Sequence, residues 1–257
     1  MGFLSDLSIR NKLFLLIAVP LAGLLYFSIG SVLEKADDVG QMASLQELSE
    51  LGVKISAVVH ETQKERGASA LYLGSGGEKF GEELQAQQQN ADRRLADLQA
   101  YLEKFDLQEF GNELRVPLES VREKLGSLSQ VREETLGLSM AVGDVLGYYT
   151  EINALLLKSI AVAATQSHNA ELTMAISAYV NFLEGKERAG IERAVLSNTF
   201  AQDRFGPGML NKFITLVAEQ KTYSRVFAAQ ATSGQQQMER EKLTHPSVEE
   251  TERMRQI

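Results

Sequence analysis

Apolar positions recur along most of the chain at the three- and four-residue spacing of an α-helix. No segment alternates apolar and polar residues as a half-buried strand does. Turn-forming stretches separate the periodic segments: GSGG (74–77), FGNELRVP (110–117), SHN (167–169), FGPG (205–208) and THPS (244–247). The pattern predicts an all-α fold, with a first helix ending near Leu73 and others over 78–104, 116–136, 139–166, 169–199 and 207–243. Their short connections are typical of antiparallel helical bundles.

The longest apolar run is residues 13–33, LFLLIAVPLAGLLYFSIGSVL, and it carries no charge. As a helix this run spans about 31 Å, close to the hydrocarbon thickness of a bilayer. The alternative is a signal peptide, but its apolar region is usually shorter, about 7–15 residues. We therefore expect a transmembrane helix at 13–33. Since Arg10 and Lys12 precede it, the positive-inside rule places 1–12 in the cytoplasm and 34–257 outside.

The last residues, HPSVEETERMRQI, predict another helix after Pro246, with Ser247 as its N-cap. A long outer region that ends in such a helix is typical of a receptor leading towards a second membrane crossing. We expect that crossing beyond Ile257.

Composition limits the chemistry. The chain has no cysteine, and His60, His168 and His245 lack the spacing of metal ligands, so we expect no metal or other cofactor. No nucleophile and base are suitably spaced, which argues against an enzyme. The formal net charge of −8 argues against nucleic acid as a partner, and it means that local groups must hold any small anion.

Two arginines occupy unexpected positions on helix faces. Arg66 falls within an apolar or small stripe formed by Leu51, Ile55, Val58, Thr62, Ser69 and Leu73. Arg193 lies about 50° from the centre of a second stripe, when residues are placed about 100° apart. That stripe consists of Leu172, Ile176, Tyr179, Leu183, Gly190, Ala194 and Ser197. Arg188, in the second of two KER tripeptides, points almost the opposite way.

A buried arginine cannot lose its proton, so it needs anionic or carbonyl partners. One interpretation is internal salt bridges, such as Arg66 with Glu192 or Arg193 with Glu65. The other is a recess for a small planar oxyanion, which a guanidinium group binds through two parallel hydrogen bonds. Small neighbours on both helices, GASA at 67–70 and Gly190 among them, favour the recess.

Further candidates for ligand contacts are polar residues near these stripes. Tyr149 and Asn153 share one face of the helix predicted at 139–166, where each could instead make an interhelical hydrogen bond. The full candidate set for ligand binding is Arg66, Arg193, Arg188, Ser69, Gly190, Tyr149 and Asn153. We expect Arg188 to matter least of the three arginines.

Several stretches resemble one family, the nitrate- and nitrite-sensing NIT domain of bacterial chemoreceptors, other membrane sensors and transcription antiterminators. They are HETQKERGASALYLGSGGEKFGEELQAQQQNADRRLADLQAYL (60–102), LLLKSIAVAA (155–164) and AYVNFLEGKERAGIERAVLSNTFA (178–201). The most specific parts are Q-x-E-R-G in the first stretch and E-x-x-G-x-E-R-A in the last. The resemblance covers about 45–235 and implies a bimodular all-helical domain whose paired arginines bind nitrate or nitrite. By motif, these arginines are Arg66 and Arg193.

Taken together, the sequence predicts the sensing part of a transmembrane receptor in the bacterial inner membrane, with 34–257 in the periplasm. LSIRNKLFLLIAVP (7–20) looks like the start of a chemoreceptor or sensor-kinase anchor, so chemotaxis is the expected pathway. We expect a homodimer, with a pocket either within or between protomers. The alternatives are a structural module without a small ligand, or a sensor of another ligand with a kinase or cyclic-dinucleotide output.

Overall fold

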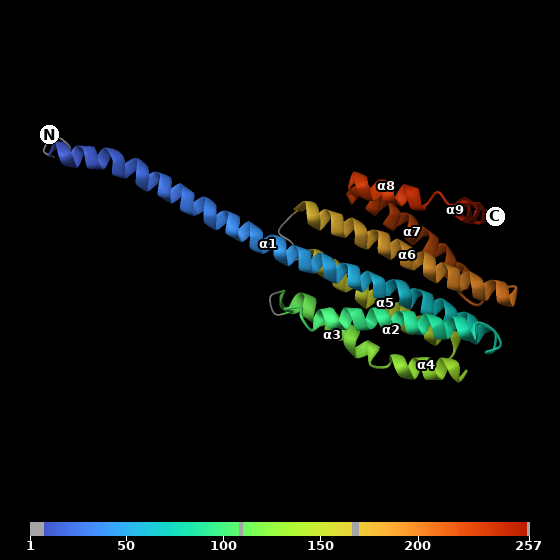
Figure 1. Ribbon diagram of the computed structural model, residues 1–257. Coiled ribbons are helices and arrows are strands. Elements are labelled where there is room, and N and C mark those ends of the chain that lie inside the picture. The colour runs from blue at the N-terminus through green and yellow to red at the C-terminus, as the bar shows by residue number, and fades with distance from the viewer. Residues whose placement is uncertain (1–7, 108–109, 166–169, 256–257) are drawn as a thin grey trace. The chain divides into compact units, whose positions relative to one another are not determined.

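The computed structural model describes residues 8–107, 110–165 and 170–255 (Figure 1). Those residues form helices and turns, without a strand among them, which confirms the predicted all-α helical bundle. The helices are α1 (Ile9–Gly74), α2 (Gly81–Leu102), α3 (Gly111–Leu125), α4 (Leu128–Leu136), α5 (Val142–Thr165), α6 (Ala170–Gln202), α7 (Met209–Gln230), α8 (Ser233–Lys242) and α9 (Pro246–Met254). The predicted turn at 167–169 lies outside the described residues.

The chain divides into two compact units, Met1–Glu47 and Leu48–Ile257. Helix α1 runs through the boundary without a break, as predicted. In the first unit many described apolar side chains are exposed, including Phe14, Ile17 and Phe27. Within the described part of the chain, no helix has both the length and the apolarity needed to cross a bilayer, so the span predicted at 13–33 is not confirmed.

In the second unit, α1 presents the predicted apolar stripe to the core. Leu51, Ile55 and Val58 are fully buried there. Helix α5 runs antiparallel to this part of α1, since Thr62 donates to Asn153 (2.6 Å) and Arg66 to Thr150 (3.0 Å). The core around them collects apolar residues from α1, α2, α3, α4, α5 and α6. This packing fixes the inward face of α1, on which Arg66 lies.

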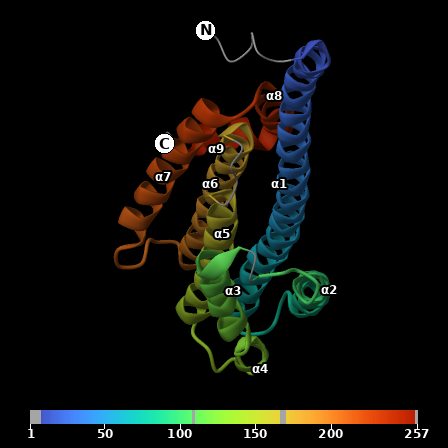
Figure 2. The ribbon, with the colours of Figure 1, turned by 90° about the vertical axis from the view of Figure 1, so that its left-hand side faces the viewer.

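Helix α6 runs parallel to α1 in the second unit. Ser56 and Tyr179 hydroxyls are 2.6 Å apart, and further along both helices Gln63 donates to Glu187 (2.7 Å). Figures 1 and 2 show α2 and α7 on opposite sides of this pair. The arrangement places the two predicted arginine-bearing segments next to each other.

Several predicted boundaries were wrong. The helix expected over 116–136 begins earlier, at Gly111, and includes the buried Pro117. It is also broken between α3 and α4 at Gly126 and Ser127. The helix expected over 207–243 is divided because Thr232 caps α8 in a capping box with Gln235.

One other detail also differs from expectation. The side chain of His245, not that of Ser247, caps α9 by accepting from the Ser247 amide (3.3 Å).

Candidate functional site

The first component of the site is a buried ion pair. Arg66 on α1 is only 1% exposed, as predicted, and its Nη1 donates to Glu187 Oε1 on α6. Nη1 also donates to Thr150 on α5 (3.0 Å), while Nη2 lies 3.4 Å from Glu187 Oε2. Arg66 thus forms an internal salt bridge, the interpretation that its small neighbours disfavoured, with a carboxylate other than Glu192. Burial explains the pairing, because a guanidinium ion held away from water requires a compensating charge.

Glu187 is itself held from several sides. It is 2% exposed, and its Oε2 accepts from Gln63 Nε2 (2.7 Å) and from Asn153 Nδ2 (3.3 Å). Asn153 in turn accepts from Thr62 (2.6 Å). Asn153 therefore makes interhelical hydrogen bonds that position the carboxylate beneath Arg66.

The second component is a reciprocal approach of arginine and glycine between α1 and α6. A Cβ atom built on Gly190 of α6 would lie 2.8 Å from Arg66 Nη2, closer than real Cβ contacts allow. A Cβ atom on Gly67 of α1 would lie 3.7 Å from Arg193 Nη2, an ordinary contact. Each guanidinium group therefore reaches the backbone of the other helix beside a glycine.

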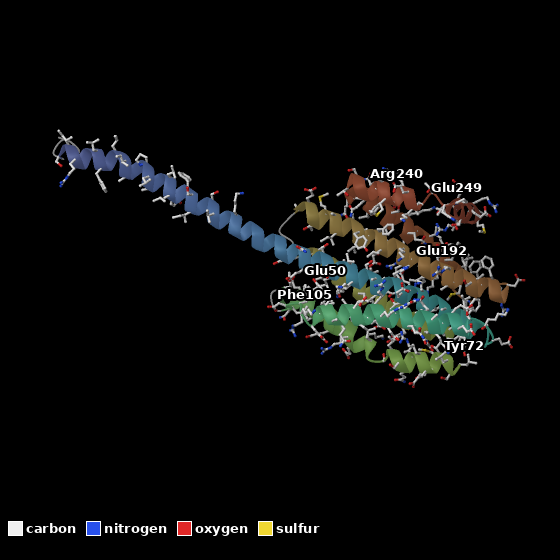
Figure 3. All side chains as sticks on the ribbon, in the orientation of Figure 1. Glu50, Tyr72, Phe105, Glu192, Arg240 and Glu249 are labelled. Carbon is white, nitrogen blue, oxygen red and sulfur yellow. The ribbon has the colours of Figure 1, made fainter. Side chains whose placement is uncertain are left out.

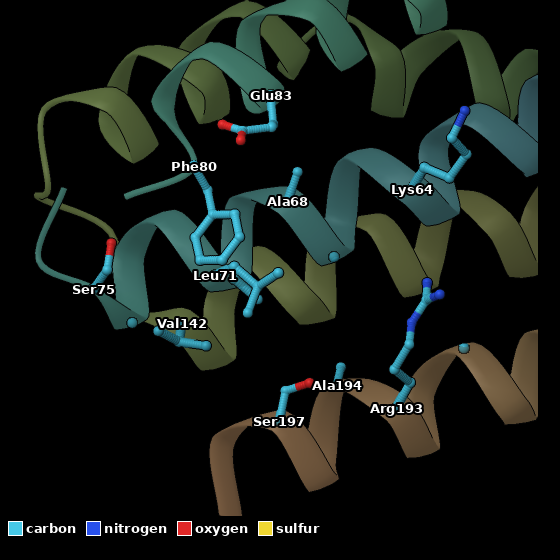
Figure 4. A pocket seen from close by; sticks show the side chains of 14 residues that line it. Lys64, Ala68, Leu71, Ser75, Phe80, Glu83, Val142, Arg193, Ala194 and Ser197 are labelled. Carbon is cyan, nitrogen blue, oxygen red and sulfur yellow. The ribbon is translucent and has the colours of Figure 1, made fainter. Parts of the chain in front are cut away.

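Arg193 differs from Arg66 in burial. Its residue is exposed, which corrects the prediction that both guanidinium groups point into the core. Among the described residues it has no hydrogen-bond or ion-pair partner. Figure 4 shows its side chain extending from α6 towards α1, on the same side as Lys64. The offset of about 50° from the stripe centre explains this position at the edge of the core.

Two hollows meet at this point. The first has a volume of about 490 Å³ and is lined by residues of α1, α5 and α6, including Gly67, Gly190 and Arg193, and by Phe80 and Glu83. The second, of about 680 Å³, is bordered by Arg66, Thr150 and Lys212. Val142 and Ala194 line both hollows. The two arginines thus face adjoining spaces large enough for a small anion.

The salt bridges suggested by the sequence do not form. Glu192 on α6 (Figure 3) pairs instead with Arg255 at the end of α9 and accepts from Gln220 (2.6 Å). Glu65 pairs with Arg132 (2.7 and 3.0 Å). Neither carboxylate is therefore the partner of a candidate arginine.

Glu65 forms a buried polar cluster of its own. It is fully buried and accepts from the Tyr149 hydroxyl at 2.7 Å. Burial, together with the negative charge of Glu65, raises the pKa of Tyr149. Burial alone would lower the pKa of Arg132, but its hydrogen bonds and charge interaction with Glu65 raise it. Tyr149 thus joins α5 to α1 and is not placed as a ligand contact.

The remaining candidate residues, Arg188 and Ser69, lie in different places. Arg188 lies on the face of α6 that meets α7, where it donates to Glu219 (2.7 Å), Glu184 (2.8 Å) and Tyr223 (3.3 Å). The structure thus keeps it apart from Arg66 and Arg193, as the sequence predicted. Ser69 is buried on the stripe that carries Arg66.

Two further cations lie near the site. The ammonium group of Lys186 is 3.0 Å from His60 Nδ1, and Lys64 pairs with Glu61 (2.8 Å). Partial removal of the half-exposed imidazole from water, and then the positive charge of Lys186, lower the pKa of His60. The described residues contain no cluster of His, Cys, Asp and Glu suited to a metal ion.

Glu187 is the main residue that sequence reasoning missed. It lies four residues after Leu183 and three before Gly190, which puts it on the apolar stripe of α6. The available signal was a carboxylate at a stripe position, but the sequence did not show that it would meet Arg66. Arg132 and Thr150 gave no comparable signal, because their roles depend on how α4 and α5 pack against α1.

Comparison with known proteins identifies the family. The NIT family, described as nitrate and nitrite sensing, matches residues 57–257. The chain belongs to the NIT family. The match includes both motifs and both arginines of the site. Membership places the chain among signal-transducing sensors of nitrate and nitrite and not among enzymes.

Two relatives support this assignment. The nitrate regulatory protein of Klebsiella oxytoca is 27% identical over 191 residues, covering 74% of this chain and 48% of the relative. The structure of the NasR transcription antiterminator superposes with a TM-score of 0.77 at 25% identity, covering 87% of this chain and 60% of that one. This NIT chain therefore spans only about half the length of the curated relative.

Proposed function

We propose that this NIT domain binds nitrate or nitrite between Arg66 and Arg193. The observation that supports the proposal is the reciprocal approach at Gly190 and Gly67, which brings both guanidinium groups to one contact between α1 and α6. The hollows beside them supply the space. Gly190 contributes by letting Arg66 lie against the backbone of α6.

The chemistry suits a flat monovalent oxyanion. Guanidinium groups present parallel N–H donors, and nitrate and nitrite present oxygen acceptors in one plane. Each charge-assisted hydrogen bond contributes roughly 1.5–3 kcal/mol net. Three or four such bonds are enough for an affinity near micromolar, which needs about 8 kcal/mol.

Ligand binding would change how α1 and α6 lie against each other. Arg193 would turn inward from the edge of the hollow to reach the anion held by Arg66. Because the two arginines come from different helices, the bridged arrangement favours a closer α1–α6 contact. The ligand shifts the equilibrium only by its differential affinity for that arrangement. A small sliding or rotation of α1 would carry the signal towards its N-terminal unit.

Calorimetric titration of nitrate, nitrite, sulfate and chloride into the protein tests the ligand. We expect nitrate or nitrite to bind the unmodified chain and Arg193→Ala to lose that binding. Arg188→Ala is the matched control, since it removes an arginine of the same helix whose partners are Glu184 on α6 and Glu219 and Tyr223 on α7. Loss of binding in Arg188→Ala alone would show that the wrong arginine was chosen. No binding to the unmodified chain would favour a structural module or a different ligand.

We also propose that 13–33 anchors the protein in the bacterial inner membrane, with 34–257 in the periplasm. The support is the run of 21 residues without a charge, of which Leu16, Leu24 and Phe27 are among the exposed apolar side chains. Alkaline extraction of membranes tests the anchor. The full chain should stay with the lipid fraction and a chain lacking 1–34 should not; release of both would exclude an integral anchor.

The output pathway follows from the same proposal. We propose chemotaxis as the output, and the anchor-like start of the chain supports this choice. Loss of swimming towards nitrate after deletion of the gene is the expected result. Unchanged swimming would favour a kinase, a cyclic dinucleotide or transcript control as the output. We further expect a homodimer, measurable by light scattering, and no affinity for nucleic acid, because the net charge is −8.

A further inference from the structure

Two charged groups of the site neutralise each other and a third is unpaired, which affects the charge of the anion that the site can hold. Arg66 and Glu187 are 1% and 2% exposed and bear opposite charges, so the buried pair is neutral. Arg193, at the edge of the same contact, has no ion-pair partner among the described residues. The three groups together carry one net positive charge.

The surrounding charges do not alter this balance. Lys64 and Glu83 line the first hollow and carry opposite charges. Lys212 and Glu151 line the second and also carry opposite charges. Lys186 adds one positive charge 3.0 Å from His60 Nδ1, and Glu61, which pairs with Lys64 and lies 4.0 Å from His60 Nε2, adds one negative charge. The exposed groups among these are screened by water and salt, whereas the buried pair is not.

We propose that Glu187 sets the valence of the anion that the site accepts. Because Glu187 neutralises Arg66, only the positive charge of Arg193 is left to balance the ligand. One positive charge favours a monovalent anion over a divalent one. Arg66 then supplies hydrogen bonds and orientation, and Arg193 supplies the compensating charge. This inference rests on the proposed anion site and identifies Glu187 as a specificity-determining residue.

Substituting Glu187→Gln tests the proposal with little change in shape. The amide keeps one oxygen, which can still accept from Gln63 and Asn153, replaces the oxygen that accepts from Arg66 Nη1 by an NH2 group, and removes the negative charge. Without it the three positions carry two net positive charges. The affinity for divalent anions should rise more than the affinity for monovalent ones. The extra negative charge of a divalent anion interacts with the positive charge that the substitution adds to the site.

Perchlorate and sulfate are suitable probes because both are tetrahedral oxyanions that differ in charge. At constant ionic strength, their affinities should be compared by calorimetry in the unmodified chain and in Glu187→Gln. We expect the substitution to raise the ratio of sulfate to perchlorate affinity by at least about tenfold. Glu192→Gln is the matched control, since Glu192 is a buried carboxylate of the same helix paired with Arg255 instead. An unchanged ratio in Glu187→Gln, or an equal rise in Glu192→Gln, would overturn the proposal.

A double substitution provides a second test. Arg193→Ala alone should lose nitrate binding, whereas Glu187→Gln with Arg193→Ala should regain it, because Arg66 then has a free charge for the anion. Failure of the double variant to bind nitrate, with circular dichroism showing intact helices, would contradict the inference.

The role of Glu187 and the anion site itself are tested separately. If the unmodified chain binds nitrate but the substitutions leave selectivity unchanged, only the role of Glu187 is wrong. If the unmodified chain binds none of the anions, the proposed site itself is wrong. Should Glu187→Gln not fold, the unmodified chain must still prefer perchlorate to sulfate, and equal affinities would overturn the role of Glu187.

Discussion

Arg66 Nη2 lies where only a glycine at position 190 leaves room for it, since a Cβ atom there would come within 2.8 Å. Gly190→Ala must therefore displace a buried guanidinium group that is fixed by Glu187 and Thr150. Overpacking a filled interior typically costs about 1–3 kcal/mol, and the better helix propensity of alanine recovers about 1 kcal/mol, so we expect a net loss of up to about 2 kcal/mol in unfolding free energy. Chemical denaturation measures this loss.

Gly67→Ala is the matched control for that prediction. Its added Cβ would lie 3.7 Å from Arg193 Nη2, which is ordinary contact. Since alanine favours a helix over glycine by about 1 kcal/mol, this variant should be neutral or slightly more stable. Equal destabilisation by both substitutions would mean that the close approach at Gly190 does not matter.

Removing Arg66 should be far more damaging to stability than removing Arg193. Arg66→Ala leaves the Glu187 carboxylate buried without its counter-ion, which typically costs about 3–5 kcal/mol. Arg193→Ala removes an exposed side chain and should change unfolding free energy by no more than about 0.5 kcal/mol. Urea denaturation of both variants checks this contrast. Similar losses would show that Arg193 is held as firmly as Arg66.

Much of this architecture was predictable from the sequence, because it depends on local periodicity. The stripe through Leu51, Ile55 and Val58 identified both the buried face of α1 and the burial of Arg66. The pairing of Arg66 could not be predicted in the same way. It depends on Glu187 being turned towards α1 by the packing of α6, a long-range relationship.

Other differences also have tertiary causes. Glu65, at the edge of its stripe, is fully buried because α4 brings Arg132 across it. Arg193 lies near the second stripe yet remains exposed, since α1 and α5 do not cover that edge of α6. A helical pattern gives the angle of a side chain but not the width of the interface that covers it.

Tyr149→Phe should weaken the fold and leave anion binding intact. The hydroxyl donates to the buried Glu65 carboxylate (2.7 Å), and its removal leaves that acceptor with one partner fewer. We expect a loss of about 1–3 kcal/mol in unfolding free energy. Thermal denaturation and nitrate titration of the same variant separate the two effects. Loss of nitrate binding at unchanged stability would restore Tyr149 as a ligand contact.

His60 makes stability depend on pH. Because burial and Lys186 lower its pKa below 6.5 in the folded state, the unfolded chain binds more protons near that pH. The stabilisation of the folded state by neutral His60 is fully present above the ordinary histidine pKa. It is lost as the pH falls through the lowered pKa of the folded state. Between about pH 7.5 and 5.5, the melting temperature of the unmodified chain should therefore fall further than that of His60→Gln. Identical losses would show that another group is responsible.

We expect one small oxyanion to contact both Arg66 and Arg193. A crystal structure of the protein grown with nitrate measures this directly. We predict nitrate oxygens about 2.7–2.9 Å from guanidinium nitrogens of both residues, with Arg193 turned in from the solvent-exposed edge. Nitrate bound elsewhere, or Arg193 still in solvent beside an Arg66 held only by Glu187, would contradict the account.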